Sequence, residues 1–245
     1  MKDDQKVKGQ VKLSRRDFLS TAAGAAAFTI VPSYVLGANG AVPPSDKLNI
    51  AGIGVGGMGS GNIARCSTEN IVSLCDVDDR RAAGTYEKFP KASKYKDFRK
   101  MLEKEKNNID AVVIATPDHQ HAVAAMACMQ LGKHVYVQKP LTHDIYEARM
   151  LTEAAHKYKV QTQMGNQGHS GEGIRLICEW IWDGAIGDVH EVHAWTDRPI
   201  WPQSVGRPAG SKPVPNGLDW NLWLGTAPYR PFNDGYLPFD WRGFW

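Results

Sequence analysis

Short apolar runs alternate with amphipathic segments in the middle of the chain. Residues 111–115 are apolar without interruption, as expected for a parallel strand that helices cover on both faces. Gly132 stands where a helix over residues 119–131 would end, and Asp144 stands where the next helix would begin. Residues 48–53, 71–75 and 134–137 are further apolar stretches of strand length, and residues 160–164 are predicted as another short strand. This alternation predicts an α/β fold, with a doubly wound parallel sheet over residues 46–168.

The composition changes after residue 168. All eight tryptophans lie between Trp180 and Trp245. A helix is predicted near residues 174–182, and residues 189–196 alternate in polarity like a half-exposed strand. We therefore expect residues 169–245 to begin an incomplete α+β domain for substrate binding, with a mainly antiparallel sheet. Because the chain stops at Trp245 within an aromatic stretch, we expect it to be a fragment of a longer protein.

The first 41 residues have the features of an export signal. Basic residues precede an alanine-rich apolar stretch at 21–36, and Ser14-Arg15-Arg16-Asp17-Phe18-Leu19 matches the twin-arginine pattern. We expect the twin-arginine export machinery to recognise this segment and the protein to be periplasmic or otherwise exported. An uncleaved membrane anchor is the alternative, although the stretch is short and contains Gly24 and Pro32.

The net charge argues against nucleic acid as a partner, and the histidine spacing argues against a metal site. Of the 29 Lys/Arg and 26 Asp/Glu residues, six and three lie in residues 1–41, which leaves 23 of each in residues 42–245. That remainder is formally neutral, so nucleic acid is not predicted as a partner. His119 and His121 open a predicted helix, where side chains two residues apart diverge, and no metal site is predicted.

A glycine-rich loop, Gly54-Val55-Gly56-Gly57-Met58-Gly59, follows the first predicted strand. Gly54 would permit a tight turn, Gly56 a close approach of the backbone to phosphates, and Gly59 close packing of helix and strand. The N–H groups at the start of the following helix favour an anion. The loop therefore predicts a Rossmann-type dinucleotide site.

Asp76 indicates which dinucleotide is bound. It ends the second predicted strand, 22 residues beyond Gly54. A carboxylate there can accept both ribose hydroxyls of NAD and would repel the 2′-phosphate of NADP. NAD is therefore the predicted cofactor, while Arg80 and Arg81 leave NADP as a minor alternative, because either can reach toward a 2′-phosphate.

Two further motifs follow neighbouring strands. Thr116-Pro117-Asp118-His119-Gln120-His121 comes after residues 111–115, and Gln138-Lys139-Pro140 comes after residues 134–137. Ligands of open α/β sheets bind outside these strand ends. With Pro140 fixing the turn, the Lys139 ammonium can stabilise a developing alkoxide or help to move a proton. Lys139 is the candidate catalytic residue, and a solvated loop lysine is the alternative.

The three motifs, in this order and spacing, resemble the Gfo/Idh/MocA family, which includes glucose–fructose oxidoreductase and inositol dehydrogenase. The resemblance covers about residues 47–245, and Leu-Asp-Trp-Asn-Leu-Trp-Leu-Gly at 218–225 with Trp-Arg-Gly-Phe-Trp at 241–245 resembles its exported subgroup. The family's Glu-Lys-Pro motif falls on residues 138–140. Gln138 replaces the glutamate and would not pair electrostatically with Lys139.

The resemblance implies where ligands bind. It places residues 116–121 near the cofactor, and Asn166 with Gln167 near nicotinamide and substrate. It also implies an Asp-x-Gly-x-His-x-x-Asp segment beyond Trp245, with a histidine as acid/base partner. The predicted cofactor-binding residues are Gly54, Gly56, Gly57, Met58, Gly59, Asp76, Thr116, Pro117, His121, Gln138, Lys139, Asn166 and Gln167.

These observations lead to an expected function. The protein is expected to be an exported NAD-dependent oxidoreductase, homo-oligomeric when full length, that transfers a hydride between a sugar, polyol or glycoside and a tightly bound nicotinamide. Two alternatives remain: an NAD-dependent glycosidase that oxidises its substrate transiently, and a non-catalytic protein that binds carbohydrate or NAD. Four tryptophans can stack on a pyranose or pack in the core: Trp195, Trp201, Trp220 and Trp223.

Overall fold

The computed structural model describes residues 42–198 and 202–243. The predicted export signal therefore lies outside the described residues. The chain divides into two units after Asp46, and the features below belong to the unit that begins at Lys47. None of the described helices is both long enough and apolar enough to span a membrane.

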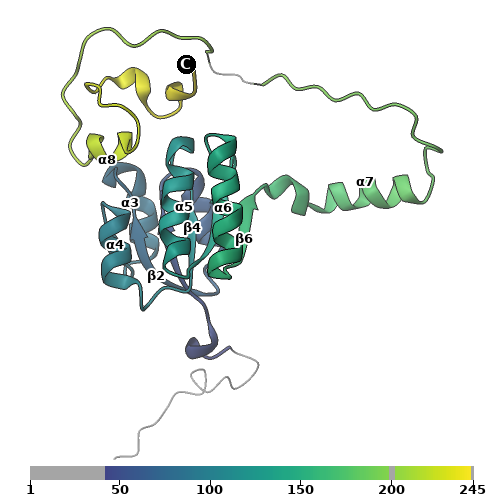
Figure 1. The fold of residues 1–245 in the computed structure, drawn as a ribbon, viewed down its shortest axis with the longest axis horizontal. Helices are drawn as coiled ribbons and strands as arrows, with labels where there is room; N and C mark the ends of the chain where they lie inside the picture. The colour runs from purple at the N-terminus through teal and green to yellow at the C-terminus, as the bar shows by residue number, and fades with distance from the viewer. Residues whose placement is uncertain (1–41, 199–201, 244–245) are drawn as a thin grey trace, which may run out of the picture. The chain divides into compact units, whose positions relative to one another are not determined.

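A six-stranded parallel sheet forms the centre of this unit (Figure 1). The strand order is β3-β2-β1-β4-β5-β6, so the direction of winding reverses between β1 and β4. This confirms the predicted doubly wound sheet, and it places a ligand crevice at the carboxyl ends of β1 and β4. The strands are β1 (Asn49–Ile53), β2 (Asn70–Cys75), β3 (Ser93–Tyr95), β4 (Ala111–Ile114), β5 (His134–Gln138) and β6 (Thr162–Gly165).

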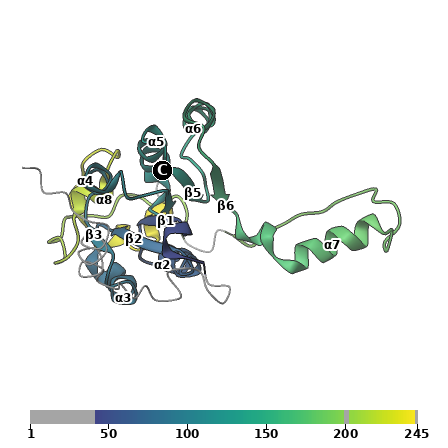
Figure 2. The same ribbon diagram turned by 90° about the horizontal axis from the view of Figure 1, so that it is seen from below.

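Helices cover both faces of the sheet (Figure 2). On one face lie α2 (Met58–Arg65) and α3 (Asp79–Lys88). On the other lie α4 (Phe98–Glu105), α5 (His121–Gln130) and α6 (Ile145–Tyr158). This two-sided cover is the physical reason for the uninterrupted apolar sequence of the central strands.

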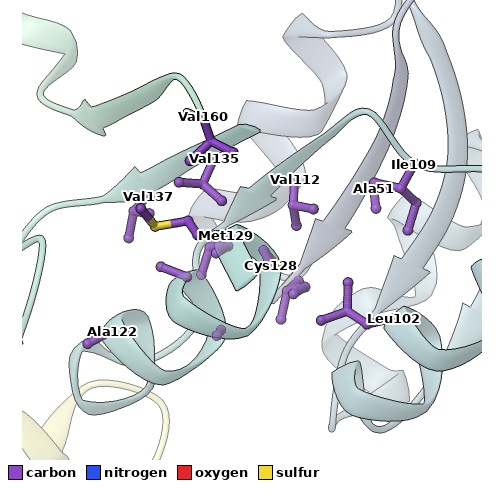
Figure 3. Close-up of a cluster of buried hydrophobic side chains, with 14 of the residues drawn as sticks. Ala51, Leu102, Ile109, Val112, Ala122, Cys128, Met129, Val135, Val137 and Val160 are labelled. Atoms are coloured by element: carbon purple, nitrogen blue, oxygen red, sulfur yellow. The ribbon is translucent and has the colours of Figure 1, made fainter. Parts of the chain in front are cut away.

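The larger core lies between the sheet and helices α4, α5 and α6 (Figure 3). Val112 and Val135 project from β4 and β5 toward Cys128 and Met129 of α5. Both α5 residues are fully buried. A smaller core on the opposite face is built from Ile50, Val55, Ile63, Leu74, Ala82, Ala92 and Val113.

Aspartates cap three of the helices that pack on the sheet. The carboxylates of Asp78 and Asp97 accept the backbone N–H groups of Arg80 and Arg99 at the starts of α3 and α4. Asp144 accepts the backbone N–H of Glu147 at 2.8 Å and begins α6, as its spacing predicts. These contacts satisfy helix N–H groups that have no partner within the helix.

The chain beyond β6 is only partly as predicted. α7 (Glu172–Trp182) agrees with the expected helix. The strand predicted over residues 189–196 is wrong, because these residues form no strand in the structure. Alternation alone cannot make a strand, since each strand needs a partner for its backbone groups. Trp195 is 88% exposed, and the described residues beyond α7 contain no sheet.

Residues 217–225 return to the carboxyl edge of the sheet. The Asp219 N–H donates to the Val77 carbonyl at 2.8 Å, and the Asp79 N–H donates to the Gly217 carbonyl at 3.0 Å. The segment contains the short helix α8 (Trp220–Leu224), which Asp219 caps. It brings tryptophans over the strand ends where ligands of such sheets bind.

Candidate active site

A cavity of about 610 Å³ lies at the carboxyl edge of the sheet. The glycine loop and the ends of β2, β4 and β5 line one side of it. Residues from 221–226 and 237–242 line the other side. Its size matches that of small-molecule and cofactor sites, and it spans the point where the strand order reverses.

The glycine loop is packed too closely for a side chain at Gly54 or at Gly59. Gly54 has a φ of +75°, and a Cβ there would lie 2.7 Å from the Ala115 carbonyl carbon. A Cβ on Gly59 would lie 1.8 Å from the Gly54 carbonyl oxygen. Glycine at these positions therefore lets β1 turn sharply and lets α2 begin directly against the end of the strand.

The N-terminus of α2 differs from those of its neighbours. Gly57 is its N-cap and offers no side chain, whereas aspartates cap α3 and α4. Gly56, Gly57 and Met58 all line the cavity. The Gly59 N–H donates to the Gly56 carbonyl at 3.0 Å, but no side chain occupies the start of α2, so the positive end of its dipole faces the cavity and suits an anion.

The Asp76 carboxylate organises the loop beside this helix start. Its Oδ2 accepts the Gly56 N–H at 2.9 Å, and its Oδ1 accepts the Asp78 N–H at 2.9 Å. Burial raises the pKa of Asp76, and these backbone N–H groups oppose the rise. Each carboxylate oxygen can accept a second hydrogen bond, so Asp76 can also receive hydroxyl groups from a ligand.

The two arginines after β2 have different surroundings. The Arg80 guanidinium donates to both carboxylate oxygens of Asp78, through Nε at 2.9 Å and Nη2 at 2.7 Å. Arg80 does not line the cavity, whereas Arg81 does. Of the two arginines that the sequence leaves as 2′-phosphate ligands, only Arg81 faces the cofactor side.

The ends of β4 and β5 contribute polar groups to the same cavity. Thr116, Pro117, Gln138 and Lys139 all line it. Lys139 is exposed, while Gln138 is 6% exposed. The Gln138 Nε2 and the Thr116 Oγ1 are buried and have no hydrogen-bond partner among the described residues. A buried donor without an acceptor is costly, so both groups suit contact with a polar ligand.

His121 joins the two strand-end loops. Its Nδ1 lies 2.6 Å from the Pro140 carbonyl oxygen, and its Nε2 lies 2.9 Å from the Thr116 carbonyl oxygen. The side chain is 1% exposed. Both ring nitrogens of His121 therefore contact backbone carbonyl groups. The contact with Pro140 fixes the turn that carries Lys139.

Aromatic residues form the opposite wall. The rings of Trp223 and Trp241 lie edge to face, 6.5 Å apart, and both line the cavity. Each also contacts the ring of His119, whose Nε2 is 3.2 Å from the Trp223 carbonyl oxygen. Burial lowers the pKa of His119, so the neutral imidazole is the form in this wall at neutral pH.

The sequence profile of a family described as "Oxidoreductase family, NAD-binding Rossmann fold" (GFO_IDH_MocA) matches residues 48–166. These residues belong to the Gfo/Idh/MocA family. NAD is the cofactor of this domain, and the uncapped start of α2 and the buried Asp76 carboxylate fit its pyrophosphate and ribose.

Relatives of this chain include proteins named as glycosidases and as dehydrogenases. A glycosyl hydrolase family 109 protein of Shewanella pealeana is 27% identical over 206 residues, which are 73% of this chain and 45% of the relative. An inositol 2-dehydrogenase of Rubrobacter xylanophilus is 32% identical over 148 residues, which are 58% of this chain and 42% of the relative. The chain thus spans less than half the length of these relatives.

Solved structures have the same fold. An NAD-binding oxidoreductase from Klebsiella pneumoniae is 29% identical with a TM-score of 0.50, over 58% of this chain and 40% of that one. The scyllo-inositol dehydrogenase of Lactobacillus casei, solved with NAD(H) and scyllo-inositol, is 22% identical with a TM-score of 0.52. That alignment covers 58% of this chain and 43% of the other.

The structure does not bring every predicted site residue to the cavity. Asn166 and Gln167 follow β6 and do not line it; the Gln167 side chain instead donates to the Asn62 side chain at 3.4 Å. Trp220 is 5% exposed and stacks on Trp223 at 4.8 Å, so it packs in the interior. Trp195 does not line the cavity, and Trp201 lies outside the described residues.

Sequence reasoning missed part of the aromatic wall. Trp241 and Arg242 line the cavity, although the sequence assigns them no role there. The motif around Trp241 is visible in the sequence, but nothing in its spacing shows that it folds back onto the β4 loop. No group of three or more His, Cys, Asp or Glu side chains suited to a metal ion occurs in the part of the chain that the structure describes.

Proposed function

We propose that the protein is an exported NAD-dependent oxidoreductase that transfers a hydride between a sugar, polyol or glycoside and a tightly held nicotinamide. The observation that supports this most directly is the shared cavity: the glycine loop, Asp76 and Lys139 all line it. The first two suit the nucleotide, and Lys139 lies beyond the strand-order reversal, where the reacting part of the cofactor would be expected.

The residues divide the work as follows. The start of α2 would hold the pyrophosphate, and the Asp76 carboxylate would accept hydrogen bonds from the ribose hydroxyls. Bound NAD supplies the hydride acceptor. The Lys139 ammonium stabilises negative charge that develops on the substrate oxygen, or moves its proton. His121 positions Lys139 by contacting the Pro140 carbonyl.

Export constrains how the cofactor is used. Twin-arginine substrates cross the membrane folded, so the protein can load NAD in the cytoplasm. Because free NAD is scarce outside, the nicotinamide has to be tightly held and returned to its starting state within a turnover. Reduction of a second sugar achieves this, and so does cleavage of a glycoside by oxidation, elimination and re-reduction.

One observation favours the glycosidase as the second candidate. The alignment with the glycosyl hydrolase family 109 protein covers 73% of this chain, which is more than the NAD-binding domain alone. An α-N-acetylgalactosaminidase of Shewanella oneidensis is 24% identical over 205 residues, covering 72% of this chain and 44% of the relative. Both alignments therefore include residues outside the NAD-binding domain.

Product analysis distinguishes the candidates. Purified protein with its bound nucleotide is incubated with free sugars, polyols and nitrophenyl glycosides. Formation of a ketose, lactone or aldonate with matching reduction of a second sugar supports the oxidoreductase. Release of nitrophenol without net oxidation supports the glycosidase. Bound sugar without product would show a non-catalytic binding protein and would contradict the proposal.

A further inference from the structure

Residues 217–242, which we call the roof, form the side of the cavity opposite the sheet. Their segments 221–226 and 237–242 face the glycine loop and the strand ends across the cavity. The roof has an apolar cluster of its own, distinct from the two cores that pack on the sheet. Its buried members are Leu218, Trp220, Leu224, Phe232 and Tyr236. The roof therefore packs as one body over the place where the nucleotide is expected.

One end of the roof is held at the end of β2 by backbone groups. The Asp219 N–H donates to the Val77 carbonyl at 2.8 Å, and the Asp79 N–H donates to the Gly217 carbonyl at 3.0 Å. The Lys96 ammonium also donates to the Gly217 carbonyl, and it forms an ion pair with Asp79 at 2.9 Å. Separating this end would break two backbone hydrogen bonds and an ion pair together, so we call it the fixed end.

The other end of the roof rests on the loop after β4 and is held through side chains. The His119 Nε2 lies 3.2 Å from the Trp223 carbonyl oxygen. The His119 ring also lies edge to face with the rings of Trp223, at 5.5 Å, and Trp241, at 6.0 Å. The Arg242 Nη2 lies 3.3 Å from the Asp118 Oδ1. Side-chain contacts of this kind can break and reform without unfolding the backbone on either side.

Gln120 lies beneath the roof at this second end. It is 7% exposed and lines the cavity, and its Nε2 is a buried donor without a hydrogen-bond partner among the described residues. Gly225 of the roof lies directly against it, because a Cβ on Gly225 would lie 1.3 Å from that Nε2. The closed roof therefore buries an amide that water satisfies when the roof is open, which is unfavourable. An oxygen atom of a bound nucleotide can accept from this amide and so favour closure.

We propose that the roof is hinged at its fixed end and opens at the loop after β4 to admit and release NAD. Opening breaks the contacts of His119 with Trp223 and Trp241. The Gln120 amide couples closure to the nucleotide by donating a hydrogen bond to it. The inference rests on the proposed function only for the need to keep NAD through a turnover, and it does not depend on which sugar reacts.

His119→Ala tests the opening end, because His119 contacts the roof and does not line the cavity. Stopped-flow tryptophan fluorescence follows the binding of NAD to nucleotide-free protein and the displacement of bound NAD by excess ADP-ribose. The variant loses one hydrogen bond and two ring contacts that hold the roof closed. We expect NAD association and NAD release both to become about tenfold faster. His156→Ala removes an exposed histidine from α6, outside the cavity lining, and is the matched control.

The two rates together distinguish a hinged roof from a wall that merely contacts the nucleotide. Loss of a contact made only in the complex raises the release rate and leaves association nearly unchanged. A roof that has to open controls entry as well as exit, so both rates rise. A faster release alone, or no change in either rate, overturns the inference.

Hydrogen exchange of the wild-type protein locates the hinge without any variant. The five-residue helix α8 has little stability of its own and depends on its contacts. Removing NAD is therefore expected to speed exchange of the Gly225 and Ala227 N–H groups by about tenfold or more, and to leave the Asp79 and Asp219 N–H groups at the fixed end unchanged. Equal exchange at both ends with and without NAD, or faster exchange at the fixed end, overturns the inference.

Turnover is scored separately from these measurements. A protein that holds NAD beneath the roof but converts no sugar contradicts the proposed function and leaves this inference standing. A protein that oxidises sugars but exchanges NAD at the same rates in wild type and His119→Ala overturns this inference alone.

Discussion

Asp76→Asn tests the nucleotide site with the smallest change of shape. The carboxylate accepts two backbone N–H groups, from Gly56 and Asp78, and the amide keeps only one acceptor oxygen. One buried N–H therefore loses its partner, which costs about 1–3 kcal/mol of unfolding free energy. The ribose hydroxyls also lose a charged acceptor, so we expect NAD binding to weaken by about 1–2 kcal/mol.

This loss of binding free energy corresponds to a rise of about 5- to 30-fold in the Kd of NAD. It is measured by calorimetric titration of protein from which bound nucleotide has been removed. The preference for NAD over NADP should also fall, because the amide does not repel a 2′-phosphate. Glu103→Gln removes one exposed carboxylate from α4, outside the cavity lining, and is the control for net charge. An unchanged Kd for NAD in Asp76→Asn would refute this reasoning.

Acidification should reproduce part of the same effect. Burial raises the pKa of Asp76 above its ordinary value of 3.8. NAD binds the ionised carboxylate, so affinity should be complete well above the raised pKa and fall as the pH drops through it. Taken alone, the raised pKa means that the nucleotide-free fold binds this proton more strongly than the unfolded chain does. The group therefore stabilises the free protein as the pH falls, and Asp76→Asn should lack both dependences.

Three further predictions concern other parts of the chain. Lys139→Ala should leave NAD content unchanged and lower kcat more than it raises KM, by about 10²–10³ in rate; near-normal kcat would make Lys139 a solvated lysine. Gly59→Ala should lower the unfolding free energy by about 1–3 kcal/mol, whereas Gly61→Ala on the same helix has open space around its Cβ and should be neutral or stabilising by thermal denaturation. Arg15→Lys with Arg16→Lys should leave folded protein in the cytoplasm, and unchanged periplasmic recovery would contradict the export proposal.

The sequence predicts the central sheet because its signals are local and repeated. Four of the six strands coincide with apolar runs, and Gly132 and Asp144 stand at the helix ends that they predict. β6 is also predicted, although its Thr162 and Gln163 are polar. The strand that the sequence does not predict is β3, which has three residues and an exposed Ser93 and Lys94. A strand so short at the edge of a sheet carries no measurable periodicity.

The sequence predicts only those site residues that directly follow a strand of the sheet. The glycine loop, Asp76 and Lys139 follow strand ends, so their positions are set by local pattern. The contact of Arg242 with Asp118 joins residues 124 positions apart, and no spacing rule reports it. The strand predicted at residues 189–196 is wrong for the same reason. An alternating sequence indicates which side chains would share one face, but it does not show which neighbouring strand would supply the hydrogen bonds.

The most direct test of the proposed chemistry is the absorbance of the bound nicotinamide. Purified protein with its co-purified nucleotide is mixed with a single sugar substrate in the absence of a second acceptor, and the near-ultraviolet band of NADH is recorded through one turnover. We expect NAD to be the extracted nucleotide, the band to appear with wild-type protein, and Lys139→Ala to slow its appearance steeply. Extraction of mainly NADP, or an unchanged spectrum with every sugar, polyol and glycoside that binds, would contradict the proposal that this cavity oxidises a carbohydrate with NAD.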